Sequence, residues 1–188
     1  MTDTIHLKYP EGIIPKDDLE LLRVQLGEHG IGFEWHDISD EPQASVEELL
    51  APIILYLSSD VAQAYILGLA TSASYDVIKS TVLDLWRHIS GKKINKITST
   101  DIEEVDANFD LDVNTSGKTR VKFKLKGNIP DSLKEKCIDK AFHLLESTNF
   151  PENQNRYVCC YDVDSEQWEI LEELEFIRKY IIPKNGNG

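Results

Sequence analysis

The stretch that decides the fold is 104–126, EVDANFDLDVNTSGKTRVKFKLK, in which apolar and polar side chains alternate on both sides of a central turn. This period-two alternation is typical of β-strands that bury one face and expose the other. The polar positions are mostly acidic before the turn and basic after it. We therefore predict an antiparallel hairpin whose outer face sets acids on one strand against bases on the other.

The turn sets the register of this hairpin. Residues 114–118, NTSGK, suit a three-residue loop with Gly117 in the left-handed conformation. Pairing Asn114 with Lys118 predicts the following neighbours: Phe109 with Phe123, Leu111 with Val121, Asp112 with Arg120, Asp110 with Lys122, and Asp106 with Lys126. The charged pairs are expected on the exposed face, where each contributes about 0.2–1 kcal/mol.

Residues 1–42, N-terminal to the hairpin, predict a βαβ-like unit. Alternation at 5–9 indicates a half-buried strand, and an apolar stripe at 19–26 indicates a helix that begins after Pro15. Gly30 ends that helix, and 31–35 predicts a second strand.

Residues 43–93 predict a central apolar helical region. The stretch 49–71, LLAPIILYLSSDVAQAYILGLAT, is mostly apolar and rich in small side chains. The run Ser58-Ser59-Asp60 interrupts it and suits the N-terminal cap of a second helix that continues to Ile89. We expect two helices that pack closely through small residues and stay buried.

Residues 94–183 predict a ββαββα region that contains the hairpin. A helix follows Pro130, two strands are expected at 156–161 and 168–171, and a closing helix carries an apolar face. Residues 184–188 are expected to form a frayed tail. The whole pattern predicts the α+β class, and it leaves open whether the three regions are separate or form one compact domain.

Composition limits the classes of function. The 188 residues carry a formal net charge of −13, with 41% hydrophobic and 28% charged residues. Phosphate backbones would be repelled by such a surface, so no nucleic acid is expected as a partner and a basic protein partner is favoured. Three cysteines without metal-ligand spacing, and an N-terminus without the features of a signal peptide, predict a cytoplasmic protein.

No motif predicts a catalytic residue, a metal site or a cofactor. The sequence has neither a glycine-rich phosphate loop nor a nucleophile elbow, and its five histidines lack zinc-ligand spacing. His6 and His36 would come together only if their strands pair. An enzyme assembled from distant residues stays open, and a pocket that gathers carboxylates with His36 or Cys159 would indicate one.

The densest acidic run lies at 162–175 and is followed by no basic residue until Arg178. It lacks the central glycine and the terminal glutamate of a calcium loop. A solvated turn and helix face is one explanation, and a docking surface for a basic partner is the other. The partner-binding candidates are Asp162, Asp164, Glu166, Glu169, Glu172 and Glu173.

The central apolar stretch supports an alternative hypothesis, because its length approaches that of a membrane span. Asp60 lies near its middle, where a charge costs about 2.5–3.5 kcal/mol on insertion scales. In this alternative, residues 49–73 are sheltered and insert into a membrane when triggered. The membrane-segment candidates are Leu55, Tyr65, Ile66, Leu67 and Gly68.

The layout also resembles a known group of proteins. A strand-helix-strand unit leads to a helix with YDVIK at 75–79 and LWR at 85–87, followed by the charged strand VKFKLKG at 121–127. This resembles small uncharacterised bacterial proteins associated with conflict and phage-defence loci. The resemblance implies an accessory role and no catalytic residues. The leading hypothesis is a non-enzymatic, protein-binding accessory protein in bacterial defence or toxin immunity, and the alternative is a membrane-perturbing effector.

Overall fold

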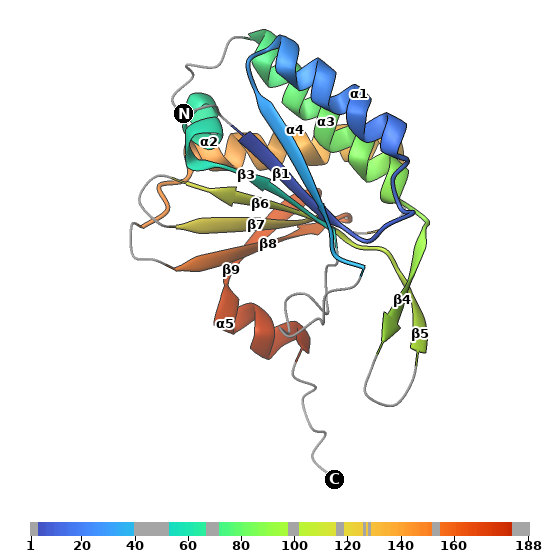
Figure 1. Cartoon of the computed structure of the whole chain (residues 1–188). Helices are drawn as coiled ribbons and strands as arrows, with labels where there is room; N and C mark the ends of the chain where they lie inside the picture. Colours follow the sequence, from blue (N-terminus) through green and yellow to red (C-terminus); the bar gives the residue numbers. More distant parts are fainter. Residues whose placement is uncertain are drawn as a thin grey trace.

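The computed structural model describes residues 4–39, 53–66, 72–97, 102–115, 119–125, 127, 129–151 and 155–181. In these residues, a seven-stranded mixed sheet has the order β2-β1-β3-β6-β7-β8-β9, and β4 and β5 form a separate two-stranded sheet (Figure 1). The α+β class predicted from the sequence is confirmed. The strands are β1 Thr4–Tyr9, β2 Gly32–Asp37, β3 Ile53–Leu57, β4 Lys93–Ile97, β5 Ile102–Asp106, β6 Phe109–Asn114, β7 Arg120–Leu125, β8 Arg156–Asp162 and β9 Gln167–Glu172. The helices are α1 Lys16–Glu28, α2 Ser59–Ile66, α3 Ser72–Ile89, α4 Asp131–Ser147 and α5 Glu173–Phe176, which continues into a π-helical turn, η1, Ile177–Ile181.

The three regions expected from the sequence all contribute strands to the large sheet. The N-terminal unit β1-α1-β2 is confirmed, with β1 and β2 parallel. Gly30 ends α1 with φ of 74°, a conformation that glycine adopts without a steric cost. The order β6-β7-α4-β8-β9-α5 is the ββαββα region.

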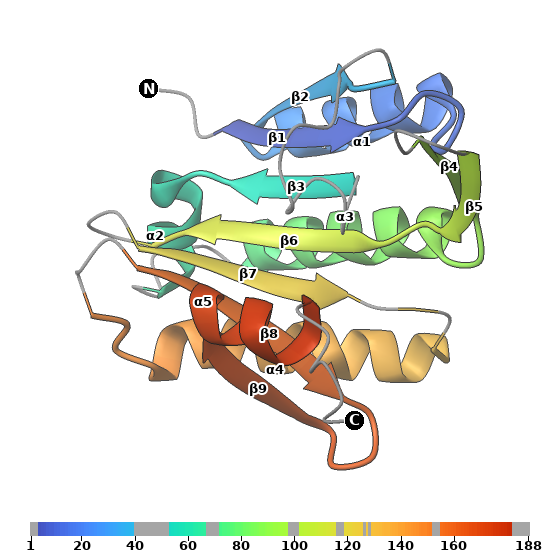
Figure 2. The ribbon, with the colours of Figure 1, turned by 90° about the horizontal axis from the view of Figure 1, so that it is seen from below.

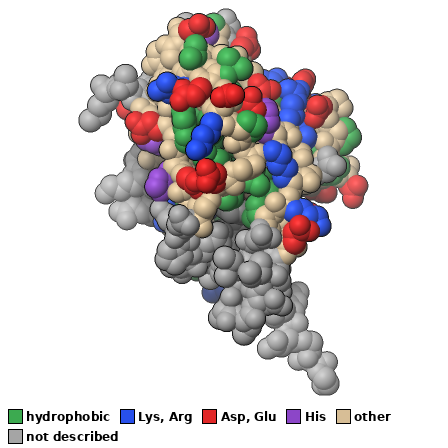
Figure 3. All heavy atoms as spheres, turned by 45° about the vertical axis from the view of Figure 1, so that its right-hand side comes forward, with side chains coloured by type: hydrophobic (Ala, Val, Ile, Leu, Met, Phe, Trp, Pro, Cys, Tyr) green, Lys and Arg blue, Asp and Glu red, His purple; other side chains and the backbone are tan. Residues whose placement is uncertain are grey.

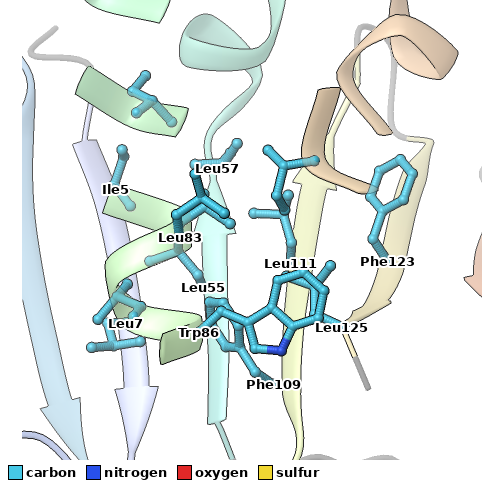
Figure 4. Close-up of a cluster of buried hydrophobic side chains, with 14 of the residues drawn as sticks. Ile5, Leu7, Leu55, Leu57, Leu83, Trp86, Phe109, Leu111, Phe123 and Leu125 are labelled. Atoms are coloured by element: carbon cyan, nitrogen blue, oxygen red, sulfur yellow. The ribbon is translucent and has the colours of Figure 1, made fainter. Parts of the chain in front are cut away.

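The long helices α1, α3 and α4 cover one face of the large sheet, while α5 lies on the other (Figure 2). The apolar side chains of the alternating strands point toward these helices. Figure 4 shows Leu55 and Leu111 from the central strands gathered around Trp86 of α3, which is only 2% exposed. Burial of each such side chain contributes about 1.5–3 kcal/mol to stability. This face holds most of the core.

Three crossovers between parallel strands give the sheet its two unlike faces. The connections β1-α1-β2 and β3-α3-β6 are right-handed, whereas β7-α4-β8 is left-handed (Figure 2). About 98% of such crossovers are right-handed. A right-handed connection here would have placed α4 over the opposite face. The left-handed one sets α4 beside α3 and leaves the second face of β1, β2, β3, β6 and β7 uncovered by the long helices.

The hairpin formed by β6 and β7 is confirmed, but its predicted register is wrong by two residues. Asn114 pairs with Arg120, so Phe109 faces Leu125 and Leu111 faces Phe123. A shift by two keeps every side chain on the same face, so alternation cannot distinguish the two registers. The amide and the hydroxyl of Thr115 both donate to the carbonyl oxygen of Thr119 at 3.0 Å, which closes a longer loop.

The predicted acid–base pairs change with the register. Asp110 pairs with Lys124 in place of Lys122, and the two side chains are buried instead of exposed. Asp112 lies opposite Lys122, yet its carboxylate still binds Arg120. Asp106 does not belong to this hairpin at all, because the chain leaves the strand at Ala107 and β5 pairs with β4, where Asp106 faces Lys93. Lys126 and the turn residues 116–118 lie outside the described residues.

The prediction of two helices in the central region is wrong for the first, whose described part is a strand, while the second, from the Ser58-Ser59-Asp60 cap to Ile89, is present as α2 and α3. Ile53–Leu57 forms β3, between β1 and β6. A short apolar run fits a doubly buried strand and a buried helix equally well, so periodicity alone gave the wrong assignment. The Ser58 hydroxyl accepts a hydrogen bond from the Val61 amide at 3.4 Å, as expected of a helix cap. Residues 43–52 and 67–71 lie outside the described residues.

Polar contacts join α3 to α4 along their exposed edges. Asp139 accepts a hydrogen bond from the Tyr75 hydroxyl at 3.1 Å. It also forms an ion pair with Lys79, whose Nζ lies 2.6 Å from Asp139 Oδ1. Burial, followed by the charge of Asp139, raises the pKa of Tyr75 to about 12. Near the other end, Lys134 is buried against the Trp86 ring, 5.8 Å from its centroid, and pairs with Asp131. These contacts hold the two helices antiparallel.

Candidate functional site

The candidate site lies on the sheet face that α1, α3 and α4 leave uncovered. Strand alternation sends the polar residues of the predicted half-buried strands to this face, and the register aligns them in two rows across the sheet. The first row is Glu34, His6, Tyr56, Asp112 and Lys122, and the second is His36, Lys8, Ile54, Asp110 and Lys124. Five strands thus bring together polar groups that are far apart in the sequence.

A concavity of about 610 Å³ opens over the first row and extends beyond it to Ser58, Asn114 and Arg120. This volume lies within the range of about 300–1,000 Å³ that is usual for small-molecule sites. The lining combines the aromatic ring of Tyr56 with charged and titratable groups: His6, His36, Lys8, Arg120, Glu34 and Asp112. An apolar wall with a few convergent polar groups is the usual composition of a ligand site.

Asp112 and Arg120 form the most firmly fixed pair of the concavity. Arg120 Nε donates to one carboxylate oxygen at 3.2 Å, and Nη2 donates to the other at 2.8 Å. The Asp112 side chain is only 5% exposed, whereas that of Arg120 is 36% exposed. Such two-point pairs are stronger and more directional than single contacts. The carboxylate therefore holds the guanidinium in place and leaves part of it facing the solvent.

The Tyr56 ring lies at the centre of the first row, near one cation from β1 and one from β7. The Lys8 amine is 6.0 Å from the ring centroid, and the Arg120 guanidinium carbon is 5.4 Å from it. Cations at this distance are attracted by the negative face of an aromatic ring. Beyond them, His6 Nδ1 lies 3.3 Å from a carboxylate oxygen of Glu34, and both of these side chains are more than half exposed.

The adjoining part of this face is closed by the C-terminal segment. Phe176 of α5 packs with Val158, Cys160 and Leu171 in a small apolar cluster over β8 and β9. The Lys124 amine lies 5.9 Å from the Phe176 ring and 2.6 Å from Asp110 Oδ2. Within the described residues, Asp110 Oδ1 has no hydrogen-bond partner. Burial raises the pKa of this carboxyl, although the charge of Lys124 opposes the shift.

The structure does not bring the six acidic partner-binding candidates onto one surface. Asp162 and Asp164 lie in the β8–β9 turn, where Asp162 accepts hydrogen bonds from Ser165 and from the Asp164 amide. Because strand residues alternate, Glu169 and Glu172 point to opposite faces of β9. Glu169 pairs with Lys179 and Tyr180, and these hydrogen bonds lower its pKa.

The other acidic candidates also have partners within the chain. Glu166 adopts a φ of 50° at the turn and lies 3.6 Å from the amines of both Lys136 and Lys140 of α4. Glu172 accepts a hydrogen bond from Asn155, and Glu173 pairs with Arg156. Figure 3 shows one side of the molecule, on which acidic and basic side chains are interspersed. The acidic run is thus divided among several local contacts.

The membrane-segment candidates occupy different positions. Leu55 is fully buried in β3, at the centre of the sheet. Tyr65 and Ile66 belong to α2, while Leu67 and Gly68 lie outside the described residues. None of the helices in the described ranges is sufficiently long and apolar to span a membrane. Insertion of Leu55 would require the central strand to leave the sheet.

The cysteines are buried, as expected for at least one of them. Burial raises the pKa of Cys137 to about 12 and that of Cys159 above its usual range, which disfavours a thiolate nucleophile. The described residues contain no group of three or more His, Cys, Asp and Glu side chains arranged to hold a metal ion. In contrast, His36 does share the concavity with two carboxylates, Glu34 and Asp112. From the sequence, such a gathering would indicate an enzyme assembled from distant residues.

Comparison with known proteins identifies no relative: no family model, no curated protein and no solved structure matches this chain. We therefore infer the function from the geometry of the open face.

Proposed function

We propose that this chain is a binding protein that holds a small ligand in the concavity on the open face of its sheet. The observation that carries the proposal is the convergence of aromatic, cationic and titratable side chains from five strands on one concavity of about 610 Å³. A second layer of helices could cover such a polar face of a sheet. Here the left-handed crossover takes α4 away from it, and none of the long helices among the described residues covers this face.

Several features favour binding over catalysis. Ser58 is a hydroxyl that lines the concavity, and it already accepts the Val61 amide as a helix cap. The Cys137 and Cys159 thiols are buried on the helix-covered side of the sheet. Among the described lining residues, the contact between His6 and Glu34 joins two largely exposed side chains, which is a weak arrangement for a general base.

Ligand capture tests this proposal directly. The tagged protein is incubated with a small-molecule extract of bacterial cells, washed, and denatured, and the released compounds are identified by mass spectrometry. We expect at least one compound to be enriched on the wild type and lost from His6→Trp, because the larger side chain fills the concavity. His143→Trp, on an exposed position of α4, is the matched control. Equal capture by His6→Trp would contradict the proposed location.

A second candidate is the accessory, protein-binding role predicted from the sequence, and one observation favours it. Ile170 on the edge strand β9 and Leu174 at the start of α5 are 36% and 66% exposed, close in sequence to Glu172. Exposed apolar side chains beside charged ones are usual at protein interfaces. A basic partner there would lose affinity on Glu172→Lys and Leu174→Ser, and binding unchanged by both would remove this candidate.

We place either role in a bacterial cytoplasm, in a defence or toxin-immunity system. The three cysteines are free thiols, which supports a reducing compartment. The resemblance to conflict-associated proteins supports the system. The role in defence can be tested by the plating efficiency of phage on bacterial cells that express the gene and on cells that do not.

A further inference from the structure

We infer that the group recognised in the concavity is an anion, a phosphate or a carboxylate, held by Lys8 and Arg120 beside Tyr56. This inference rests on the proposed function and names the chemistry of its ligand. It follows from which charges of the site are already engaged and which are available.

The carboxylates of the concavity are occupied. Asp112 is almost completely buried and receives two hydrogen bonds from Arg120. Glu34 lies beside His6 and points toward solvent. A cationic ligand would have to displace Arg120 from Asp112 or bind Glu34 alone at the exposed rim. Neither arrangement provides a buried anionic centre.

The cations are available. The Lys8 amine makes no hydrogen bond or ion pair with any described residue, and it is held near the Tyr56 ring. Arg120 uses one edge of its guanidinium for Asp112, and the planar group carries further N–H donors. Because the ring attracts both cations, the Lys8 amine and the Arg120 guanidinium carbon are held 6.0 Å and 5.4 Å from its centroid before any ligand arrives. Because the Lys8 and Arg120 side chains are already held in place, binding of an anion by both would cost little side-chain entropy.

Further bases lie beside the concavity, and those of β7 and β8 are balanced by acids such as Asp110 and Glu173. Strand β7 contributes only bases to the open face: Arg120, Lys122 and Lys124. Arg156 of β8 lies opposite Arg120 in the register and pairs with Glu173. On a chain with 33 acidic and 20 basic residues, such a gathering of bases is not expected from composition. Arginine and lysine together are the usual ligands of phosphate and carboxylate groups.

Isothermal titration calorimetry with chosen probes tests the inference. The probes are pyrophosphate, citrate, the cation choline and neutral glucose. We expect pyrophosphate or citrate to bind, and binding to weaken when salt rises from about 50 mM to about 300 mM. Lys8→Gln should weaken the binding by about tenfold or more, because a charge-assisted contact is lost. Lys93→Gln, in the separate β4–β5 sheet, is the matched control and should bind like the wild type.

Arg120 requires a paired variant, because removal of its charge alone would leave Asp112 buried without a partner. Arg120→Gln combined with Asp112→Asn removes both charges, and thermal unfolding checks that this variant folds. We expect it to lose anion binding as Lys8→Gln does. Preserved anion binding in both variants would overturn the inference.

The probes also separate the inference from the proposed function. Pyrophosphate binding without citrate binding would identify a phosphate ligand, and the reverse would identify a carboxylate. Binding of choline or glucose that is lost in His6→Trp would retain the ligand site and overturn its anionic specificity. A lack of binding by both anions would also overturn the anion inference, while ligand capture from the extract would still decide on the proposed function.

Discussion

The buried ion pair between Asp110 and Lys124 provides the sharpest test of how the open face is built. The carboxylate is 1% exposed and the lysine side chain is 9% exposed, with Nζ 2.6 Å from Oδ2. At that distance, and with an effective dielectric constant of about 20, the attraction is about 6 kcal/mol. Removal of two ions from water costs several kcal/mol each, so the pair as a whole is close to neutral for stability.

Loss of one partner is different, because the other charge stays buried. Lys124→Met would leave both oxygens of Asp110 without a partner among the described residues, since Oδ1 has none already. We expect the free energy of unfolding to fall by about 3–5 kcal/mol at neutral pH. Replacement of both residues, Asp110→Leu with Lys124→Met, should recover most of that loss. Urea unfolding, monitored by tryptophan fluorescence, measures the free-energy change in both variants.

The pH dependence gives this prediction a second readout. Burial raises the pKa of Asp110 in the folded state, so the fold favours the protonated carboxyl and becomes less stable as pH rises through that pKa. In Lys124→Met the opposing charge is gone, and the deficit should therefore shrink as pH falls from about 7 to about 5. A deficit below about 1 kcal/mol, or one that does not change with pH, would refute the reasoning.

Three further predictions concern other parts of the molecule. Lys134→Ala should destabilise the protein by about 1–3 kcal/mol in thermal unfolding, and Lys134→Met by less, because methionine keeps the apolar stem against Trp86; equal losses would contradict this. Glu166→Gly should stay within about 1 kcal/mol of the wild type, since relief at a φ of 50° offsets two exposed ion pairs, whereas Glu166→Val should cost more. Cys137, whose pKa is raised to about 12, should resist a thiol-labelling reagent in the native protein and react on unfolding; rapid native labelling would show that the thiol is accessible.

Local patterns predicted the elements well wherever one face of a strand or helix is buried. Alternation at 104–126 correctly gave the faces of Leu111 and Val121, because it depends only on which side chains avoid water. It could not give the register, since Phe109 is buried whether it faces Phe123 or Leu125. The apolar run at Ile53–Leu57 was misassigned for a related reason: a central strand that is buried on both faces carries no period.

The candidate site could not be predicted because it depends on strand order. His6, Lys8 and His36 are visible in the sequence as polar positions of half-buried strands. Nothing local indicates that β3 lies between β1 and β6, or that Tyr56 therefore comes next to Asp112. The buried Asp110 was expected to be exposed, since its alternation with apolar residues does not reveal that the second face is partly covered.

The central claim is that the open face of the sheet around Tyr56 is the ligand-binding surface. Amide chemical-shift mapping by NMR, during titration with the probe that binds best, tests it most directly. We expect the largest shifts in β1, β3 and β7, near Lys8, Tyr56 and Arg120. Shifts confined to α1, α3 and α4, or to the β8–β9 edge, would contradict it.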